Sequence, residues 1–342
     1  MVTLKQIARA SGVSTATVSY VVNDGPRRVL PETRERVLKV IQELNYRPNV
    51  AAQGLRGKRT NTFGVAFPHI VTEPFDNVYF GPILAGIVDV ATARRQMTML
   101  FTGISLEDGD VNLSLFCDGR CDGFIFVAIP AKDPLIEKLS RRGAKMVLVG
   151  TQVQGLPVST VDSDNVEGAR QATLHLLDLG HRRIGIIQGN CDSTSGPERT
   201  LGFRLAHQER GVPVDESLLI PSRYQDDAAY LSSYRLLSMP PDRRPTAIFA
   251  AQDSIARMAY TVASELGIRI PEDVSLVGFD DVAYARHLSP PLTTVRQPLR
   301  EIGAEAATVL FNSLEADAFE PVRKIFQVDL IERASCRPPG LT

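Results

Sequence analysis

The apolar residues near the start of the chain recur with the spacing of two short amphipathic helices. One apolar face comprises Leu4, Ile7 and Ala8, and the other comprises Val18, Val21 and Val22. Gly12 lies between the two faces, where the chain must turn sharply. The pattern predicts a helix-turn-helix, a motif whose second helix fits the major groove of DNA.

Polar residues at the expected helix starts agree with this prediction. Thr3 can cap the first helix, and Gln6 three residues later completes a capping box. Ser14 is a good N-cap for the second helix. A third helix is predicted from about Pro31, which suits a first helical position, to Leu44. Its apolar stripe comprises Val37, Leu38, Ile41 and Leu44.

The charge of the chain is unevenly distributed. Residues 1–60 hold eleven Lys and Arg against four Asp and Glu, a net charge of +7, whereas the whole chain carries −1. The rest of the chain therefore carries −8. A basic head attracts DNA phosphates, and an acidic body does not bind the duplex. The alternative is a small three-helix domain used for protein contacts.

The segment after the third helix is too short to form a stable helix by itself. Its apolar residues, which would cover about one and a half turns, are Val50, Ala51, Ala52 and Leu55. Gly54 and Gly57 each lower helix stability by up to about 1 kcal/mol relative to alanine. We expect this segment to become helical only when two copies meet in a DNA groove.

From residue 61 onward, apolar strand-like runs alternate with amphipathic helical stretches. The predicted strands are 63–67, 97–101, 123–128, 145–150, 183–188, 246–251 and 274–278, and predicted helices include 82–93, 135–142, 168–179, 228–237 and 254–266. This alternation predicts parallel sheets that are covered on both faces. About 280 residues is long for one such sheet and sufficient for two.

Enzyme and membrane chemistry receive little support from the sequence. The four cysteines lack zinc spacing, and none of the five histidines stands in a nucleophile or metal arrangement. We find no glycine-rich phosphate loop, signal peptide or membrane-spanning run. The expectation is a cytoplasmic, nucleoid-associated protein with no cofactor, no metal and no catalytic residues. A hydrolase and an exported solute-binding protein remain as alternatives that would not explain the basic head.

The run from Val2 to Asn23 and the stretch Leu44–Asn49 resemble the most recognisable motifs of the lactose-repressor/galactose-repressor (LacI/GalR) family of bacterial transcription factors. The resemblance extends over essentially the whole chain. It implies an all-α helix-turn-helix head and an α/β body of the periplasmic-binding-protein type I fold, with two Rossmann-like subdomains. It also implies a homodimer that binds a pseudo-palindromic operator under the control of a small-molecule effector.

The domain boundaries follow from the resemblance and the pattern together. We expect a DNA-binding domain at 1–47, a hinge helix and linker at 48–60 and an effector-binding and dimerisation domain at 61–342. Within that domain, the first subdomain is expected at about 61–159 and 292–321. The second is expected at about 160–291 and 322–337.

The resemblance implies that Thr15, Ala16 and Tyr20 contact base edges and that Leu55 wedges into the minor groove. The alternative for Leu55 is a linker residue packed on the body. Tyr20 offers one hydroxyl or a ring face where arginine or histidine is more usual, so we expect part of the specificity to come from methyl contacts and DNA deformability. The full predicted DNA-binding set is Thr3, Leu4, Ser14, Thr15, Ala16, Thr17, Ser19, Tyr20, Asn23, Asn49, Ala52 and Leu55.

Candidate effector residues follow the predicted strands, because ligands of open α/β sheets bind at the carboxyl ends of strands. By resemblance, the predicted set is Tyr79, Phe80, Ser193, Ser195, Arg199, Gln252 and Asp280. Tyr79 and Phe80 could instead be core residues, and Arg199 could form only a structural ion pair. Asp281 is interpreted as a structural cap, and Asp164-Asn165 as a turn with a helix cap.

The predicted cleft combines an aromatic face, an arginine and an aspartate, which suits a carbohydrate or sugar phosphate. A purine or nucleoside is the alternative, since aromatic side chains also hold purines. No leucine heptads follow the last predicted strand, so a dimer without a tetramerising tail is expected.

Overall fold

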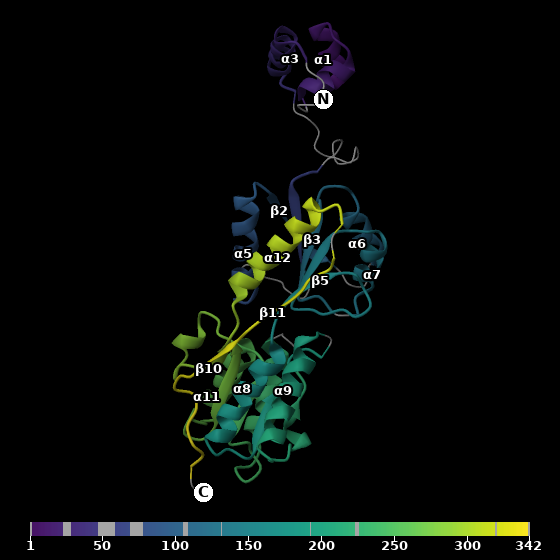
Figure 1. Ribbon diagram of the computed structural model, residues 1–342. Coiled ribbons are helices and arrows are strands. Elements are labelled where there is room, and N and C mark those ends of the chain that lie inside the picture. Colours follow the sequence, from purple (N-terminus) through teal and green to yellow (C-terminus); the bar gives the residue numbers. More distant parts are fainter. Residues whose placement is uncertain are drawn as a thin grey trace. The chain divides into compact units, whose positions relative to one another are not determined.

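The computed structural model describes residues 2–22, 29–46, 59–68, 78–104, 109–130, 132–191, 193–222, 226–318 and 320–340 (Figure 1). The chain divides into two compact units, Met1–Thr60 and Asn61–Thr342. The predicted DNA-binding residues Asn23, Asn49, Ala52 and Leu55 lie outside the described residues, as does most of the predicted hinge.

The first unit contains three helices, α1 (Leu4–Ser11), α2 (Thr15–Val22) and α3 (Pro31–Glu43). Both parts of the predicted capping box form, since the backbone N–H of Gln6 donates to Thr3 Oγ1 and the Gln6 side chain accepts from the Thr3 backbone. Gly12 ends α1 with a φ of 65°, a left-handed conformation that favours glycine. The fully buried Ile7, Val18 and Val37 join the three helices in one core. The predicted helix-turn-helix is therefore present.

The first sheet of the second unit is entirely parallel. Its strand order is β11-β5-β4-β3-β1-β2. The strands are β1 (Thr62–Pro68), β2 (Met97–Ile104), β3 (Gly123–Val127), β4 (Met146–Val149), β5 (Ser159–Ser163) and β11 (Arg323–Phe326). Phe63, Val65 and Phe67 alternate along β1 and are buried with α5 (Phe80–Ala93) and α12 (Leu299–Glu315) on one face (Figure 1). The helices α6 (Gly109–Phe116) and α7 (Pro134–Arg141) cover the other face.

The second sheet has the strand order β12-β10-β9-β8-β6-β7, and only β12 is antiparallel to its neighbour. The strands are β6 (Ile184–Ile187), β7 (Leu219–Ile220), β8 (Ala247–Ala250), β9 (Ser275–Asp280), β10 (Thr293–Arg296) and β12 (Asp329–Ile331). One apolar cluster joins the sheet to α8 (Asn165–Asp178) and α9 (Ser195–Glu209), and another joins it to α10 (Asp226–Leu237) and α11 (Asp253–Glu265). Two short 3-10 helices are Glu216–Leu218 and Ala285–His287.

The subdomain boundaries differ from the predicted ones. β5 belongs to the first sheet as far as Ser163, although the second subdomain was predicted to begin at 160. β10 pairs with β9 in the second sheet, although 292–321 was predicted for the first subdomain. β11 pairs with β5, so 323–326 belong to the first sheet and not to the second. These three strands are short, and none of them stood among the predicted strands.

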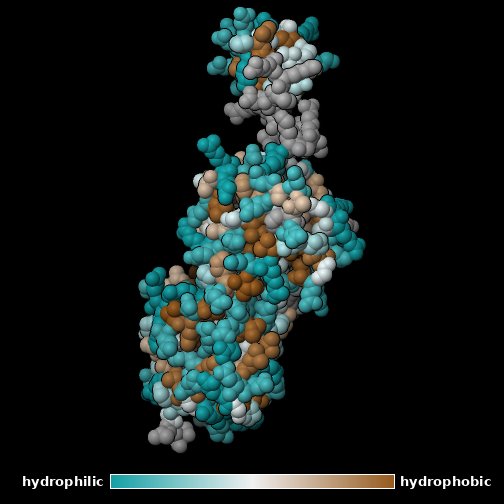
Figure 2. Space-filling model, in the orientation of Figure 1, coloured by the Kyte–Doolittle hydropathy of each residue, from teal (hydrophilic) through white to brown (hydrophobic). Residues whose placement is uncertain are grey.

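The chain crosses between the two sheets three times, from β5 to α8, from β10 to α12 and from β11 to β12. The carboxyl ends of β5, β8, β9 and β10 thus supply residues to one region. The surface of the molecule is mainly hydrophilic with scattered apolar patches in the view of Figure 2.

Candidate functional site

The start of α2 exposes small polar residues on the first unit. Thr15 and Ala16 are exposed, and Tyr20 is half-buried one turn further along the helix. The hydroxyl of Ser14 accepts a hydrogen bond from the backbone N–H of Thr17 at 3.0 Å and lies 2.9 Å from the Thr17 hydroxyl. Ser14 and Thr17 therefore stabilise the helix start, while Thr15 and Ala16 have their side chains available for contact.

Three other predicted DNA-binding residues lie on the same unit. Thr3 is exposed at the start of α1, Leu4 packs half-buried against the core, and Ser19 is half-buried on α2. The exposed Lys5 and Arg9 belong to α1, whose first turn has no acidic residue. A helix start of this kind suits a DNA phosphate, because both backbone N–H groups and cationic side chains attract it.

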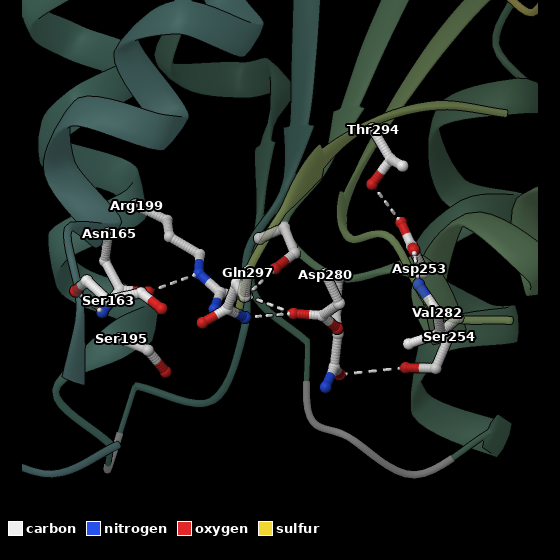
Figure 3. A network of polar contacts seen from close by, with 12 residues as sticks. Ser163, Asn165, Ser195, Arg199, Asp253, Ser254, Asp280, Val282, Thr294 and Gln297 are labelled. Carbon is white, nitrogen blue, oxygen red and sulfur yellow. Dashed lines mark hydrogen bonds and ion pairs between the residues drawn. The ribbon is translucent and has the colours of Figure 1, made fainter. Parts of the chain in front are cut away.

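Arg199, on α9, lies at the centre of a buried polar network in the second unit (Figure 3). Its Nε donates to Asn165 Oδ1 at 2.9 Å, and its Nη1 donates to the backbone carbonyl of Ala251 at 2.6 Å. Nη1 also lies 3.7 Å from Asp280 Oδ1. The guanidinium carbon is 3.7 Å from the centroid of the Phe279 ring. One buried cation thus joins α8, the end of β8 and the end of β9.

Asp280 is the last residue of β9 and is almost fully buried. Its Oδ1 accepts a hydrogen bond from Gln297 Nε2 at 2.6 Å, and the Gln252 side chain also hydrogen-bonds the carboxyl group. Burial raises the pKa of Asp280 to about 6, and the nearby Arg199 charge opposes this rise. The φ of Asp280 is 126°, a strained conformation of the kind that clusters at binding sites.

Asp253 holds Asp280 in place from the start of α11. Its Oδ1 accepts from Thr294 Oγ1 at 2.6 Å, and its Oδ2 accepts from the backbone N–H of Val282 at 3.0 Å. A Cβ at Gly278 would lie only 2.2 Å from Asp253 Oδ1, so this approach requires glycine. Burial, and then the charge of Asp280, raise the pKa of Asp253 well above its usual value.

Asp281 has the structural role that the sequence suggested, although it acts through ion pairs and not through a helix cap. Its Oδ1 lies 2.6 Å from Arg333 Nη2 and its Oδ2 lies 2.7 Å from Arg296 Nε. These bonds connect the turn after β9 to β10 and to the segment that follows β12. Both carboxylate oxygens of Asp281 are therefore engaged within the protein.

The predicted serines lie at the start of α9. Ser193 Oγ donates to the backbone carbonyl of Asn190 at 2.7 Å and lies 3.1 Å from Ser195 Oγ. Gln252 precedes α11, and its Oε1 accepts from Ser254 Oγ at 2.9 Å. This bond orients the side-chain amide nitrogen of Gln252 toward Asp280. The structure brings Arg199, Gln252 and Asp280 together and places the two serines beside the network as loop-stabilising residues.

The predicted aromatic residues have different surroundings. Phe80 is buried in the core beneath α5, and its ring packs edge-to-face against Phe67 at 5.3 Å between centroids. This placement favours the alternative reading of Phe80 as a core residue. Tyr79 is half-buried, and its hydroxyl lies 3.1 Å from the position that a Cβ would take on Gly150. Gly150 follows β4, so the tyrosine hydroxyl lies at the carboxyl end of that strand.

Sequence patterns did not single out Gln297, and they indicated only a structural turn for Asn165. Gln297 follows β10, whose four residues lack an apolar run and were not predicted as a strand. A short alternation, Thr293-Thr294-Val295-Arg296, was the available signal, because a residue after such a strand reaches the same edge as Asp280. Asp162 lies near the end of β5, and Asn165 lies two residues after it. This position at a strand end was the only signal that the sequence offered for them.

A cavity of about 460 Å³ lies next to this network, and Asp280 and Gln297 form part of its wall. Apolar residues of the cavity wall include Val78, Pro82, Val282 and Leu299. They come from the start of α5, the segment after β9 and the start of α12, so the cavity contacts both subdomains. Its size lies within the range of small-molecule sites.

The described residues lack two features, a membrane-spanning helix and a metal-binding cluster. None of their helices has the length and apolar character needed to span a membrane. They also contain no cluster of three or more His, Cys, Asp or Glu side chains with the geometry of a metal site.

Comparison with known proteins assigns the two units. A family profile described as "Bacterial regulatory proteins, lacI family" matches residues 3–49, and one described as "Periplasmic binding protein-like domain" matches residues 173–336. The chain is 37% identical over 340 residues to the HTH-type transcriptional regulator CelR of Thermobifida fusca, which covers 97% of this chain and 98% of that protein. The chain belongs to the LacI family.

Other members agree over the full length. The chain is 34% identical to the regulator DegA of Bacillus subtilis, with 98% of each protein covered. A structure of a CelR–cellobiose complex matches with a TM-score of 0.76 at 33% identity, covering 98% of this chain and all of that one. The lac repressor dimer bound to operator and the anti-inducer ONPF matches with a TM-score of 0.80 at 25% identity, covering 98% and 99% of the two chains.

The predicted family, fold and class of function are therefore confirmed. This LacI-family protein is a DNA-binding transcriptional regulator with a small-molecule effector. The relatives named above are regulators and not enzymes.

Proposed function

We propose that this protein represses transcription as a homodimer on a pseudo-palindromic operator. We further propose that a carbohydrate or sugar phosphate in the cleft of the body controls its affinity for DNA. The observation that carries the proposal is the buried network of Arg199, Asp280 and Gln297 at the carboxyl ends of strands. The adjacent cavity is also lined by residues of α5 and α12, which pack on the first sheet, so a ligand there would respond to the angle between the subdomains.

The chemistry of the network favours a ligand rich in hydroxyl groups. A buried carboxylate and two side-chain amides offer both acceptors and donors at short distances, as sugar hydroxyls require. A charge-assisted hydrogen bond to Asp280 would be strong, because almost no water competes for this carboxylate. The similar CelR structure contains cellobiose, which supports a carbohydrate for this chain as well.

A purine effector is the second candidate, because relatives include PurR repressors such as that of Vibrio atlanticus, 31% identical over 98% of this chain and 99% of the entire relative. The structure gives it less support. A purine needs open aromatic faces. One face of Phe279 is covered by the Arg199 guanidinium, and Phe80 is buried in the core. Of the two aromatic residues in the predicted set, Tyr79 is the half-exposed one.

The dimer would bury apolar side chains that the single chain leaves exposed. On α10, Leu231 is 66% exposed and the neighbouring Tyr234 is 45% exposed. On α5, Val88 is 40% exposed. Helices flanking both sheets therefore present apolar residues for a second copy. Two-fold symmetry of the dimer would impose inverted half-sites on the operator.

The test combines calorimetry with DNA binding on the full-length protein. A panel of sugars, sugar phosphates, purines and nucleosides is titrated into wild type, Asp280→Asn and the control Glu137→Gln, which alters an exposed ion pair on α7. We expect a sugar to bind wild type and the control, and to bind Asp280→Asn at least tenfold more weakly. Tight purine binding without any sugar response would replace the carbohydrate proposal with the second candidate.

A further inference from the structure

Two buried polar atoms beside the Arg199 network have no hydrogen-bond partner. They are Asp162 Oδ2 and Ser163 Oγ, at the end of β5 in the first sheet. Asp162 is 3% exposed and Ser163 is 1% exposed. A buried polar atom without a partner costs free energy, and most proteins avoid it. Such atoms at the carboxyl end of a parallel strand indicate a place for a ligand.

Both residues lie beside the network already described. Asn165 Nδ2 donates to the Ser163 carbonyl at 3.3 Å and to Glu198 Oε2 at 3.1 Å, while Asn165 Oδ1 accepts from Arg199. Asp162 is close enough for its carboxyl group to interact electrostatically with Glu198 and Arg199. Figure 3 shows Ser163, Asn165 and Ser195 on one side of Arg199, with Asp280 and Gln297 on the other.

Carboxyl groups outnumber cations around this network. The acidic side chains are Asp162, Glu198, Asp253 and Asp280, and the arginines that lower the pKa of some of them are Arg199 and Arg323. The adjacent cavity adds Asp281 and Glu301 on the acidic side and Arg296 and Arg300 on the basic side. Burial raises the pKa of each of the four carboxyl groups around the network, which shows that the surroundings already disfavour negative charge.

The two arginines of the network already have partners within the protein. Arg199 donates to Asn165 and to the Ala251 carbonyl, pairs with Asp280 and stacks on Phe279. Arg323, on β11, hydrogen-bonds Gln152 Oε1 and lies close enough to Glu198 to lower the pKa of its carboxyl group. A phosphate group would need free bidentate donors, and here it would instead meet more carboxylates than guanidinium groups.

We propose that Asp162 and Ser163 form a second ligand-contacting wall, and that the effector is a hydroxyl-rich molecule without phosphate or carboxylate. This inference rests on the proposed function and narrows its substrate class. In it, ligand hydroxyls donate to the open oxygen of Asp162 and to Asp280 on the opposite subdomain, while the Ser163 hydroxyl pairs with a ligand oxygen. One molecule then bridges β5 and β9.

The experiment uses matched pairs of sugars on the full-length protein. Calorimetry compares glucose with glucose 6-phosphate, ribose with ribose 5-phosphate, and cellobiose and trehalose with their 6-phosphates. In every pair that binds, we expect the neutral member to bind at least tenfold more tightly. Tighter binding of a phosphorylated member would overturn this inference and leave the carbohydrate proposal standing. Failure of every sugar to bind would overturn both.

Variants then test the wall itself. Asp162→Asn should weaken binding of the neutral sugar about tenfold or more, because the amide nitrogen cannot accept a hydroxyl proton, and it should reduce the discrimination against the phosphorylated member. Asp164→Asn is the control, since Asp164 caps α8 by accepting from the Glu167 backbone and asparagine caps equally well.

Ser163→Ala provides a variant that keeps every hydrogen bond of the free protein, because the removed hydroxyl has no partner there. It should weaken sugar binding by a measurable factor without lowering the melting temperature. Unchanged sugar affinity in both Asp162→Asn and Ser163→Ala would overturn the second wall.

Discussion

Individual buried charges in the polar network of the body have specific partners. Arg199 and Asp280 are almost fully buried, and each makes further hydrogen bonds to neutral groups. A buried ion pair of this kind adds little net stability, but the loss of one partner leaves the other charge unpaired in the interior. The network therefore resists substitution, which keeps its geometry fixed for ligand recognition.

Replacement of Arg199 by methionine should lower the free energy of unfolding of the body by about 3–5 kcal/mol, because Asp280 and Asn165 lose their partner. Urea denaturation followed by circular dichroism measures the change. Arg204→Met, in the same helix, is the matched control, since Arg204 forms a solvent-exposed pair with Glu216 that contributes little to stability. Equal losses in the two variants would contradict a special role for Arg199.

Tyr20→Ala should relax base preference at one or two positions of each half-site, by about 1–3 kcal/mol per position. Tyr20 is half-buried on the helix that exposes Thr15 and Ala16. Selection of bound duplexes from a random library, followed by sequencing, measures the preference. Lys5→Ala is the comparison, because loss of an exposed cation should weaken binding to all sequences similarly. An unchanged preference in Tyr20→Ala would remove this residue from the set that reads bases.

At the element scale, two glycines allow a close contact between two helices of the body. A Cβ on Gly86 of α5 would lie 1.9 Å from the carbonyl oxygen of Arg300, and one on Gly303 of α12 would lie 2.0 Å from the carbonyl oxygen of Ile83. The backbones of α5 and α12 therefore touch where the helices cross. This contact holds the first turns of α12, which begins two residues after Gln297.

Gly86→Ala should destabilise the body by about 1–3 kcal/mol, since the two backbones must separate. Gly81→Ala in the same helix should be neutral or stabilising by up to about 1 kcal/mol, because its Cβ would meet nothing within 4 Å and alanine favours the helix. Thermal unfolding of both variants distinguishes crowding from helix propensity. A stabilised Gly86→Ala would show that the helices tolerate a wider separation.

Sequence patterns predicted most long elements and failed on short ones. The three helices of the head and the seven apolar strands appear within a few residues of their expected bounds. β5, β10 and β11 escaped because polar residues such as Thr160, Asp162 and Thr294 interrupt their apolar character. The same strands deliver Asp162 and Gln297 to the cleft, so their omission hid part of the site. Arg199 and Asp280 were found through a family motif, which short-range periodicity alone would not have revealed.

At the scale of the whole molecule, the buried carboxyl groups link stability to pH. Burial raises the pKa of Asp162 to about 7, so the folded protein binds a proton that the unfolded chain has released. Stability from this group is therefore lost as pH rises toward and through about 7. Burial lowers the pKa of His175, His181 and His207, which opposes this trend below about pH 6.5, where unfolded histidines titrate.

Between pH 6.5 and 8, ionisation of Asp162 should lower the stability of the wild-type body by about 1 kcal/mol relative to Asp162→Asn, which keeps the same histidines. Urea midpoints of both proteins at the two pH values measure the difference. Asp164→Asn should behave as wild type. Equal changes in stability of the wild type and of Asp162→Asn between the two pH values would contradict the raised pKa of Asp162.

The central claim is that occupancy of the cleft changes the affinity of the head for DNA. Fluorescence anisotropy of a labelled pseudo-palindromic operator, selected by the wild-type protein, tests it with and without a saturating concentration of the sugar that calorimetry identifies. The account predicts that the sugar changes operator affinity about 5–150-fold in wild type and leaves the affinity unchanged in Asp280→Asn. An operator affinity that is the same with and without a sugar known to bind the wild-type body would contradict it.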